Sequence, residues 1–98
     1  MSLNRYAKKR DIVERPIIRA LERMGMDVMQ LDRPVDLIIG FRKQNYLLEV
    51  KTGKAKLNED QSQFVETWRG HVTVVRSVDD AIAWAKNIRA GIQIGGDL

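Results

Sequence analysis

The sequence predicts an α/β fold in which helices cover a short mixed sheet. The first observation is a set of three helical segments: the first and the last have apolar residues at helical spacing, and the middle one begins with a loose capping box. The second is a set of four short runs rich in β-branched and large apolar residues, which predict strands. Their order, αβββαβα, fits one small domain over residues 1–98.

The first helix is predicted over residues 5–24. Its apolar stripe comprises Ile17, Ile18, Leu21 and Met24. Gly25 ends the pattern. Pro16 lies inside it, where it either kinks the helix or marks the first turn of a shorter one. The pattern continues on both sides of Pro16, which favours a kinked helix.

Four strands are predicted from their content of β-branched and apolar residues. They cover residues 27–31, 36–42, 45–51 and 71–77. Turn-like stretches separate the first three, so we expect three successive strands followed later by a fourth.

Two further helices are predicted from their capping residues. Asn58 with Gln61 loosely fits a capping box at the start of a helix over residues 58–69. Ser77 opens a last helix that continues to about residue 90. The Gly-rich tail that follows, from about residue 91, is expected to be flexible.

The second and third strands are expected to form a hairpin through a loop of two or four residues. In the predicted register, Asp36 lies opposite Lys51 and Ile38 lies opposite Glu49. Because side chains alternate between the two faces of a strand, Asp36, Glu49 and Lys51 then share one face. Asp36 and Glu49 become diagonal neighbours with Cα atoms about 7–8 Å apart. A loop of odd length or a bulge would break this arrangement.

Asp36 and Glu49 on one face predict a site for a divalent cation. Two neighbouring carboxylates repel each other, which raises the pKa of one of them, and a cation removes that conflict. Hard oxygen ligands suit Mg²⁺ or Mn²⁺, and Mg²⁺ sites commonly combine one or two carboxylates with water and substrate phosphate. The alternative is that Asp36 is a solvated turn residue and that Glu49 pairs with Lys51 or Lys54 on an open sheet face.

A third acid, Glu14, is expected to face the sheet, because it precedes Ile17 and Ile18 of the apolar stripe by one helical turn. An inward carboxylate is costly unless it is paired or bound to a metal. The alternative is an exposed position, if a kink at Pro16 rotates Glu14 away from the sheet.

An ordered set of polar residues carries a resemblance to a known nuclease superfamily. Its members are Glu14, Asp36, Glu49, Lys51 and Gln61. The set resembles the PD-(D/E)XK signature. More narrowly, "RDIVERPII", "PVDLIIG", "LLEVKTGKAKLNEDQSQF" and "VVRSVDDAI" are similar to the virus-type replication-repair nuclease (VRR-NUC) branch in its minimal, phage-associated single-domain form, over nearly the whole chain. One departure is Val35, which separates Pro34 from Asp36.

The resemblance implies a restriction-endonuclease-like αβββαβ core with a mixed central sheet and a further C-terminal helix. It implies that Asp36, Glu49 and the carbonyl of Val50 bind Mg²⁺ or Mn²⁺ and that Glu14 assists through the metal or its waters. Lys51 would orient the attacking water or stabilise negative charge on the phosphate.

Gln61 has two interpretations. As the third helical residue after Asn58 it is a capping partner, whereas the resemblance implies a place in the catalytic site.

The family also implies a metal-dependent endonuclease that acts on DNA. Single-domain members resemble Holliday-junction resolvases, which act on branched DNA. We therefore expect a homodimer, because so small a domain has little surface with which to recognise a junction unless two copies join.

A basic surface supports a polyanionic partner. The formal net charge is +4 and the pI is about 9.7, which is typical of domains that attract nucleic acid. The residues expected to bind DNA phosphates are Lys8, Lys9, Arg10, Lys54 and Lys56. The alternative for each of them is an ordinary solvated surface position.

Several other classes are excluded or disfavoured. The chain has no cysteine, so disulfides and thiolate metal sites are excluded. No apolar run approaches the length of a membrane span, and we expect a cytoplasmic protein. The segment "TGKA" lacks the residues of a phosphate-binding P-loop. Trp68 and Trp84 are expected in the core or at a subunit contact, and His71 at the start of a strand.

Two other hypotheses stay open at this point. The chain could be a non-catalytic nucleic-acid-binding module that retains a vestigial nuclease site. It could instead be an interaction protein whose hairpin binds Ca²⁺ for structural reasons.

Overall fold

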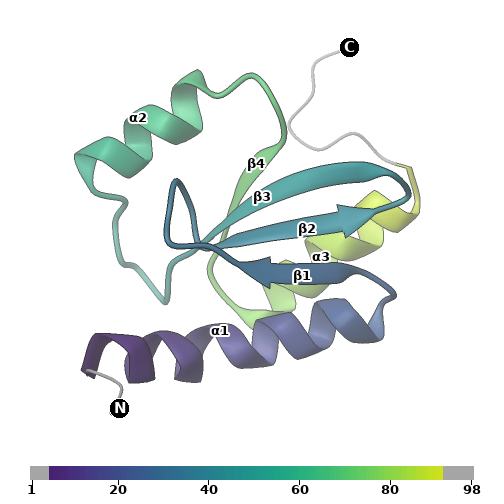
Figure 1. Ribbon diagram of the computed structural model, residues 1–98, viewed down its shortest axis with the longest axis horizontal. Coiled ribbons are helices and arrows are strands. Elements are labelled where there is room, and N and C mark those ends of the chain that lie inside the picture. The colour runs from purple at the N-terminus through teal and green to yellow at the C-terminus, as the bar shows by residue number, and fades with distance from the viewer. Residues whose placement is uncertain (1–4, 92–98) are drawn as a thin grey trace.

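Along residues 5–91, the part of the chain that the computed structural model describes, helices and strands follow one another in the predicted order αβββαβα (Figure 1). They are α1 (Arg5–Arg23), β1 (Asp27–Gln30), β2 (Leu37–Phe41), β3 (Gln44–Val50), α2 (Glu59–Thr67), β4 (Val72–Val75) and α3 (Val78–Arg89). Side chains are described from residue 10 onward. The tail predicted to be flexible lies outside the described residues, apart from Gly91.

The predicted α/β fold with a mixed sheet is confirmed. The four strands of this part of the chain form one sheet in the order β1-β2-β3-β4. The pairs β1–β2 and β2–β3 are antiparallel, whereas β3 and β4 are parallel and are connected through α2. A parallel pair requires such a crossover, because a short turn can join only antiparallel strands.

The first helix continues through Pro16 as a single segment. Proline has no N–H to donate to the carbonyl of Ile12 one turn earlier, and Ile12 lies on the exposed side of the helix, where water can satisfy that carbonyl. The helix ends as predicted at Gly25, whose φ of 84° is the left-handed conformation that glycine favours. The N–H groups of Gly25 and Met26 donate to the carbonyls of Glu22 and Leu21, which closes the last turn.

The predicted register of the β2–β3 hairpin is wrong by two residues. Arg42 and Lys43, both with positive φ, form a two-residue turn of the kind that connects tight hairpins, so Ile38 pairs with Leu47 and not with Glu49. An even shift keeps every side chain on its predicted face. When this register is extended by one residue beyond β2, Asp36 lies level with Glu49 and not with Lys51.

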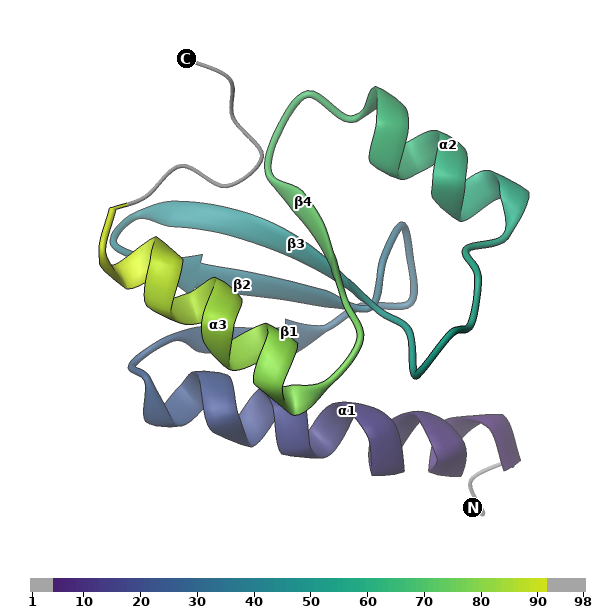
Figure 2. The same cartoon turned by 180° about the vertical axis from the view of Figure 1, so that it is seen from behind.

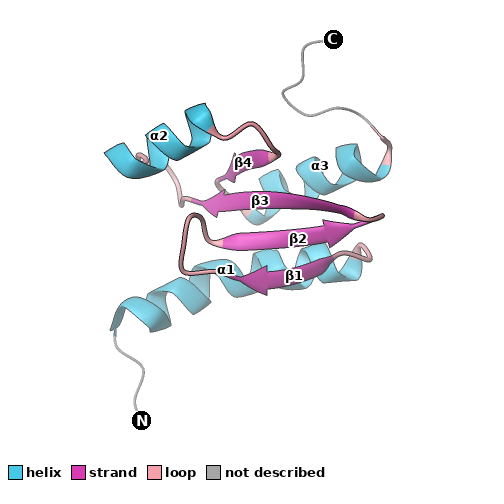
Figure 3. Ribbon diagram, turned by 45° about the horizontal axis from the view of Figure 1, so that its top comes forward, coloured by secondary structure: helices cyan, strands magenta, loops and turns pink. Residues whose placement is uncertain are grey.

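The core lies between one face of the sheet and the helices α1 and α3, which both cover that face (Figures 2 and 3). Its fully buried members include Ile17, Leu21, Leu37, Ile39, Leu48 and Val75. Two members of the predicted stripe, Ile17 and Leu21, are therefore central to the core, and Ile18 and Met24 pack at its margin. Trp84 is also buried there, as predicted.

Helix α2 lies apart from this core, beyond β4 (Figures 1 and 2). It has no buried residue, and the Phe64 ring stacks on Trp68, which is half exposed. The core placement offered for Trp68 is therefore wrong in this chain, which leaves the subunit contact as a prediction.

The sheet face opposite α1 and α3 carries an apolar row. The register places Met29, Ile38, Leu47 and Val72 side by side across the strands. Met29 is exposed and the other three are half-buried. Within residues 5–91, no helix has both the length and the apolar character that crossing a membrane requires.

Candidate functional site

A cleft of about 290 Å³ lies at the edge of the sheet where β2 begins and β3 ends, between α1 and α2. Its lining residues are Arg10, Val13, Glu14, Asp36, Glu49, Val50, Lys51, Thr52, Ala55 and Gln61. All the residues predicted from the sequence to be catalytic are among them. Residues from two helices and a hairpin are thus brought together, as the order of the elements predicts.

Asp36 directly precedes β2 and is held there by a hydrogen bond from the neighbouring strand β3. The backbone N–H of Val50 donates to Oδ2 of Asp36 at 2.8 Å. This hydrogen bond holds the carboxylate beside the end of β3, where 19% of the Asp36 side chain is exposed to solvent. Asp36 is therefore half-buried and hydrogen-bonded and is not a solvated turn residue, whereas the Glu49–Lys51 pair of the same alternative is present.

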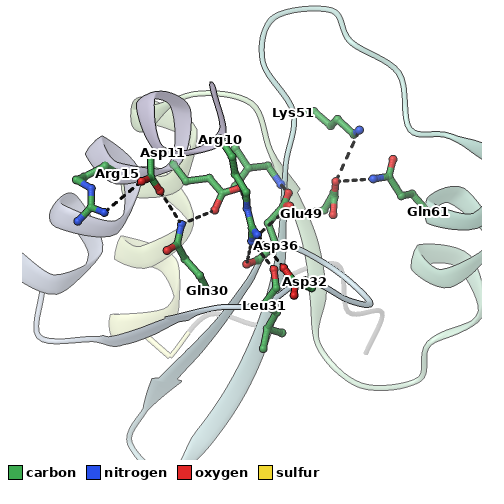
Figure 4. A network of polar contacts seen from close by, with 12 residues as sticks. Arg10, Asp11, Arg15, Gln30, Leu31, Asp32, Asp36, Glu49, Lys51 and Gln61 are labelled. Carbon is green, nitrogen blue, oxygen red and sulfur yellow. Dashed lines mark hydrogen bonds and ion pairs between the residues drawn. The ribbon is translucent and has the colours of Figure 1, made fainter. Parts of the chain in front are cut away.

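Glu49 is the most deeply buried acid of the cleft, with 2% of its surface exposed. Its Oε2 accepts a hydrogen bond from Nε2 of Gln61 at 3.0 Å and lies 3.8 Å from Nζ of Lys51 (Figure 4). Burial raises the pKa of Glu49 to about 7, the negative charge of Asp36 adds to this, and the Lys51 ammonium partly offsets it. Glu49 and Asp36 are thus close enough to repel each other, as predicted.

Gln61 is the predicted capping partner, and its side chain also reaches Glu49 in the cleft. Its side-chain Oε1 accepts a hydrogen bond from the backbone N–H of Asn58 at 2.9 Å. The backbone N–H of Gln61 donates in turn to Oδ1 of Asn58, which completes the capping box of α2. Because the amide oxygen faces that N–H donor, the amide nitrogen is directed at the Glu49 carboxylate. The cap therefore orients Gln61 toward the cleft.

Glu14 faces inward from α1, with 3% of its surface exposed, so the predicted inward position is confirmed. It accepts hydrogen bonds from Nε of Arg10 at 2.8 Å and from Nε2 of Gln30 at 3.1 Å. Burial raises the pKa of Glu14, these two hydrogen bonds oppose the rise, and the charge of Asp36 adds to it. Gln30, an exposed residue at the end of β1, was not predicted as a site residue.

The predicted DNA-binding residues lie in different surroundings. Lys54 and Lys56 are exposed on the loop after β3. Arg76 holds that loop, because its Nη1 donates to the carbonyls of Gly53 at 3.2 Å and Ala55 at 2.5 Å. Nothing in the sequence identified Arg76 for this role.

The other basic residues belong to α1. Arg10 is largely buried and contacts Glu14 and Asp36, and it does not lie on an open surface. Lys8 and Lys9 are in the first turns of the helix, and their side chains lie outside the described residues.

The donor set fits a hard divalent cation. Among the described residues, no three histidine, cysteine, aspartate or glutamate side chains form a ready-made metal cluster. Asp36 and Glu49 offer two carboxylates, and Mg²⁺ sites commonly need no more from the protein because water and phosphate oxygens complete them. Burial and, after it, the negative charge of Asp36 raise the pKa of Glu49, and a cation between the two acids would relieve their repulsion.

No protein-family model matches this chain, and neither a curated protein nor a solved structure matches it. What the cleft can do therefore follows from the chemistry of its own residues.

The raised pKa of Glu49 predicts that the protein loses stability as the pH rises. Folded Glu49 holds its proton up to about pH 7, whereas an unfolded glutamate releases it near 4.5, so the folded state binds more protons between these values. The free energy of unfolding should fall across this window by roughly 3 kcal/mol, since a tenfold change in proton affinity is worth about 1.4 kcal/mol. Glu14, whose pKa is also raised, acts in the same direction.

This pH dependence is measured by urea unfolding in metal-free buffer, with wild type compared with Glu49→Gln. The glutamine cannot ionise, so the variant should gain stability relative to wild type as the pH rises. A difference between the two proteins that stays constant from pH 4.5 to 7.5 would contradict the placement of Glu49.

Proposed function

We propose that this protein is a metal-dependent deoxyribonuclease that hydrolyses phosphodiester bonds of DNA with Mg²⁺ or Mn²⁺, in the manner of the VRR-NUC branch that its sequence resembles. The observation that carries the proposal is the meeting of Asp36, Glu49 and Lys51 in one cleft, with Lys51 3.8 Å from Glu49. Two carboxylates and an ammonium in one cleft match the needs of phosphodiester hydrolysis, which requires an activated water and a cation near the phosphate.

The residues have separate roles in this proposal. Asp36, Glu49 and the carbonyl of Val50 would hold the divalent ion, which would lower the pKa of a bound water and neutralise charge on the phosphate. The side chain of Lys51 is 21% exposed, so its ammonium can reach a phosphate in the cleft and stabilise the negative charge that develops there. Gln61 keeps the Glu49 carboxylate oriented through its hydrogen bond.

DNA would be held by charge beside the cleft. Lys54 and Lys56 lie on the loop that borders it, and Arg76 keeps that loop in place. Lys8 and Lys9 are proposed to contact phosphates from the start of α1. Such contacts release counterions, so binding should weaken steeply with salt. We place this activity in the cytoplasm of a bacterial or phage-infected cell.

We further propose a homodimer that acts on branched DNA. The apolar row of Met29, Ile38, Leu47 and Val72 is left uncovered by α1 and α3, and a second copy would remove it from water. Light scattering at micromolar concentration should give about twice the mass of one chain. A monomer, even with junction DNA present, would contradict this part of the proposal.

Cleavage of an end-labelled four-way junction tests the proposal. Linear single- and double-stranded DNA of the same sequence serve as controls, and each substrate is incubated with Mg²⁺, Mn²⁺ or a chelator. Paired symmetric cuts that require metal and occur only in the junction support a structure-selective nuclease. Equal cutting of linear DNA would support the nuclease activity but contradict a preference for branched DNA. Binding without metal-dependent cutting of any substrate favours the non-catalytic binding module.

A further inference from the structure

Arg10 occupies a position that suits a structural role better than contact with DNA. Its side chain is 17% exposed and reaches from α1 to the segment between β1 and β2. Nε donates to Oε2 of Glu14 at 2.8 Å, and one terminal nitrogen donates to the carbonyls of Leu31 and Asp36, the latter at 3.0 Å (Figure 4). The other terminal nitrogen lies 3.4 Å from Oδ1 of Asp32.

The two carbonyls that Arg10 contacts are the two ends of one loop. The N–H of Leu31 also donates to the carbonyl of Asp36 at 2.7 Å, so the loop is closed where Arg10 contacts it. Asp36 is thereby held twice, at its carbonyl by Arg10 and at its carboxylate by the N–H of Val50. A shift of this loop would move the Asp36 carboxylate away from Glu49.

We infer that Arg10 is a positioning residue, which holds the loop of residues 31–36 so that the Asp36 carboxylate stays beside Glu49, and that it is not a DNA-phosphate contact. The part of this inference that concerns metal binding rests on the proposed function. The part that concerns the loop does not.

The identity of the side chain matters for this role. A guanidinium presents five N–H donors in a planar fork, so it can serve Glu14 and two backbone carbonyls at once. A lysine ammonium at the same place is a compact point charge at the end of a flexible chain, and it cannot span these acceptors. Arg10 also places a positive charge 4.0 Å from Oδ1 of Asp36 and beside the buried Glu14.

The test compares Arg10→Lys and Arg10→Gln with wild type. Arg15→Gln is the control, since Arg15 forms an exposed ion pair with Asp11 on the same helix, 3.7 Å long. The first readout is hydrogen exchange of the Val50 amide in metal-free protein, because that amide is bonded to Asp36. The amide of Lys51, which donates to the carbonyl of Val75, is the internal reference for intact folding.

Both Arg10 variants should lose protection at Val50 and keep it at Lys51, whereas Arg15→Gln should change neither. Unchanged protection of Val50 in Arg10→Lys and Arg10→Gln would overturn the inference. Loss of protection at both amides in Arg10→Gln would reflect a general destabilisation of the fold. In that case the protection of the Val50 amide in the charge-conserving Arg10→Lys decides whether Arg10 positions the loop.

Two further readouts separate this inference from the proposed function. The Mn²⁺ affinity, followed by the paramagnetic resonance signal of free Mn²⁺, should weaken by about 10- to 100-fold in the Arg10 variants. The salt dependence of DNA binding should be unchanged. If the plot of log binding constant against log salt concentration lost the slope of about one phosphate contact while Mn²⁺ binding stayed intact, Arg10 would be a phosphate contact and the inference would be overturned. Absence of Mn²⁺ binding in wild type would remove the proposed function, while the Val50 amide would still decide the role of Arg10.

Discussion

Replacing Lys51 by alanine should lower the rate of metal-dependent DNA cleavage by about 10²- to 10³-fold, the usual cost of removing one group that stabilises charge in a transition state. Nζ of Lys51 lies 3.8 Å from Glu49 in the lining of the cleft, and its side chain is exposed enough to reach a phosphate there. The rate is measured in single-turnover reactions at saturating DNA and metal, so that weaker binding does not contribute.

Lys86→Ala is the matched control for this prediction. Lys86 is an exposed lysine on α3, which packs against the sheet and contributes no residue to the cleft. Its removal subtracts the same charge from the protein without touching the site. Equal activity of Lys51→Ala and Lys86→Ala would show that Lys51 takes no part in the chemistry.

Replacing Asp36 by asparagine should lower the cleavage rate at least about 10³-fold, because the variant loses one of the two carboxylates proposed to hold the metal. The fold should be retained, since the asparagine oxygen can still accept the hydrogen bond from the N–H of Val50. Removing the charge of Asp36 also removes one cause of the raised pKa of Glu49. Asp36→Asn should therefore be at least as stable as wild type at pH 8.

Thermal unfolding and single-turnover cleavage measured on the same samples test both halves of this prediction. Asp27→Asn is the control, because Asp27 is an exposed aspartate that pairs with Gly40 at the far end of the sheet from the cleft. A folded Asp36→Asn protein that cleaves DNA at the wild-type rate would rule out Asp36 as a metal ligand.

The shared face of Asp36 and Glu49 could be predicted because the alternation of side chains along a strand is a local property. Side chains alternate along each strand and the loop has an even number of residues, as assumed, so Asp36 and Glu49 were placed on one face although the register was wrong by two residues. The turn itself could not be located. Arg42 and Lys43 both adopt positive φ, which Asn or Gly would have signalled in the sequence and these residues do not.

The long-range contacts of Arg10 and Arg76 could not be predicted, for a physical reason. Arg10 and Arg76 bind backbone carbonyls of segments distant in the sequence, such as those of Asp36 and Gly53. Every residue presents a carbonyl, so such an acceptor leaves no mark on the sequence. A buried arginine and an exposed arginine look alike until the fold brings their acceptors to them.

A calorimetric titration of the DNA-free protein with Mn²⁺ at pH 7, in buffers of different ionisation enthalpy, shows whether Asp36 and Glu49 bind a metal ion. We expect binding of about one ion per chain, accompanied by proton release, because Glu49 is partly protonated at this pH and must ionise to bind the metal. Binding should be lost in Asp36→Asn. No binding to wild type, or binding that is unchanged by Asp36→Asn and releases no proton, would contradict the claim that these two carboxylates form a metal site.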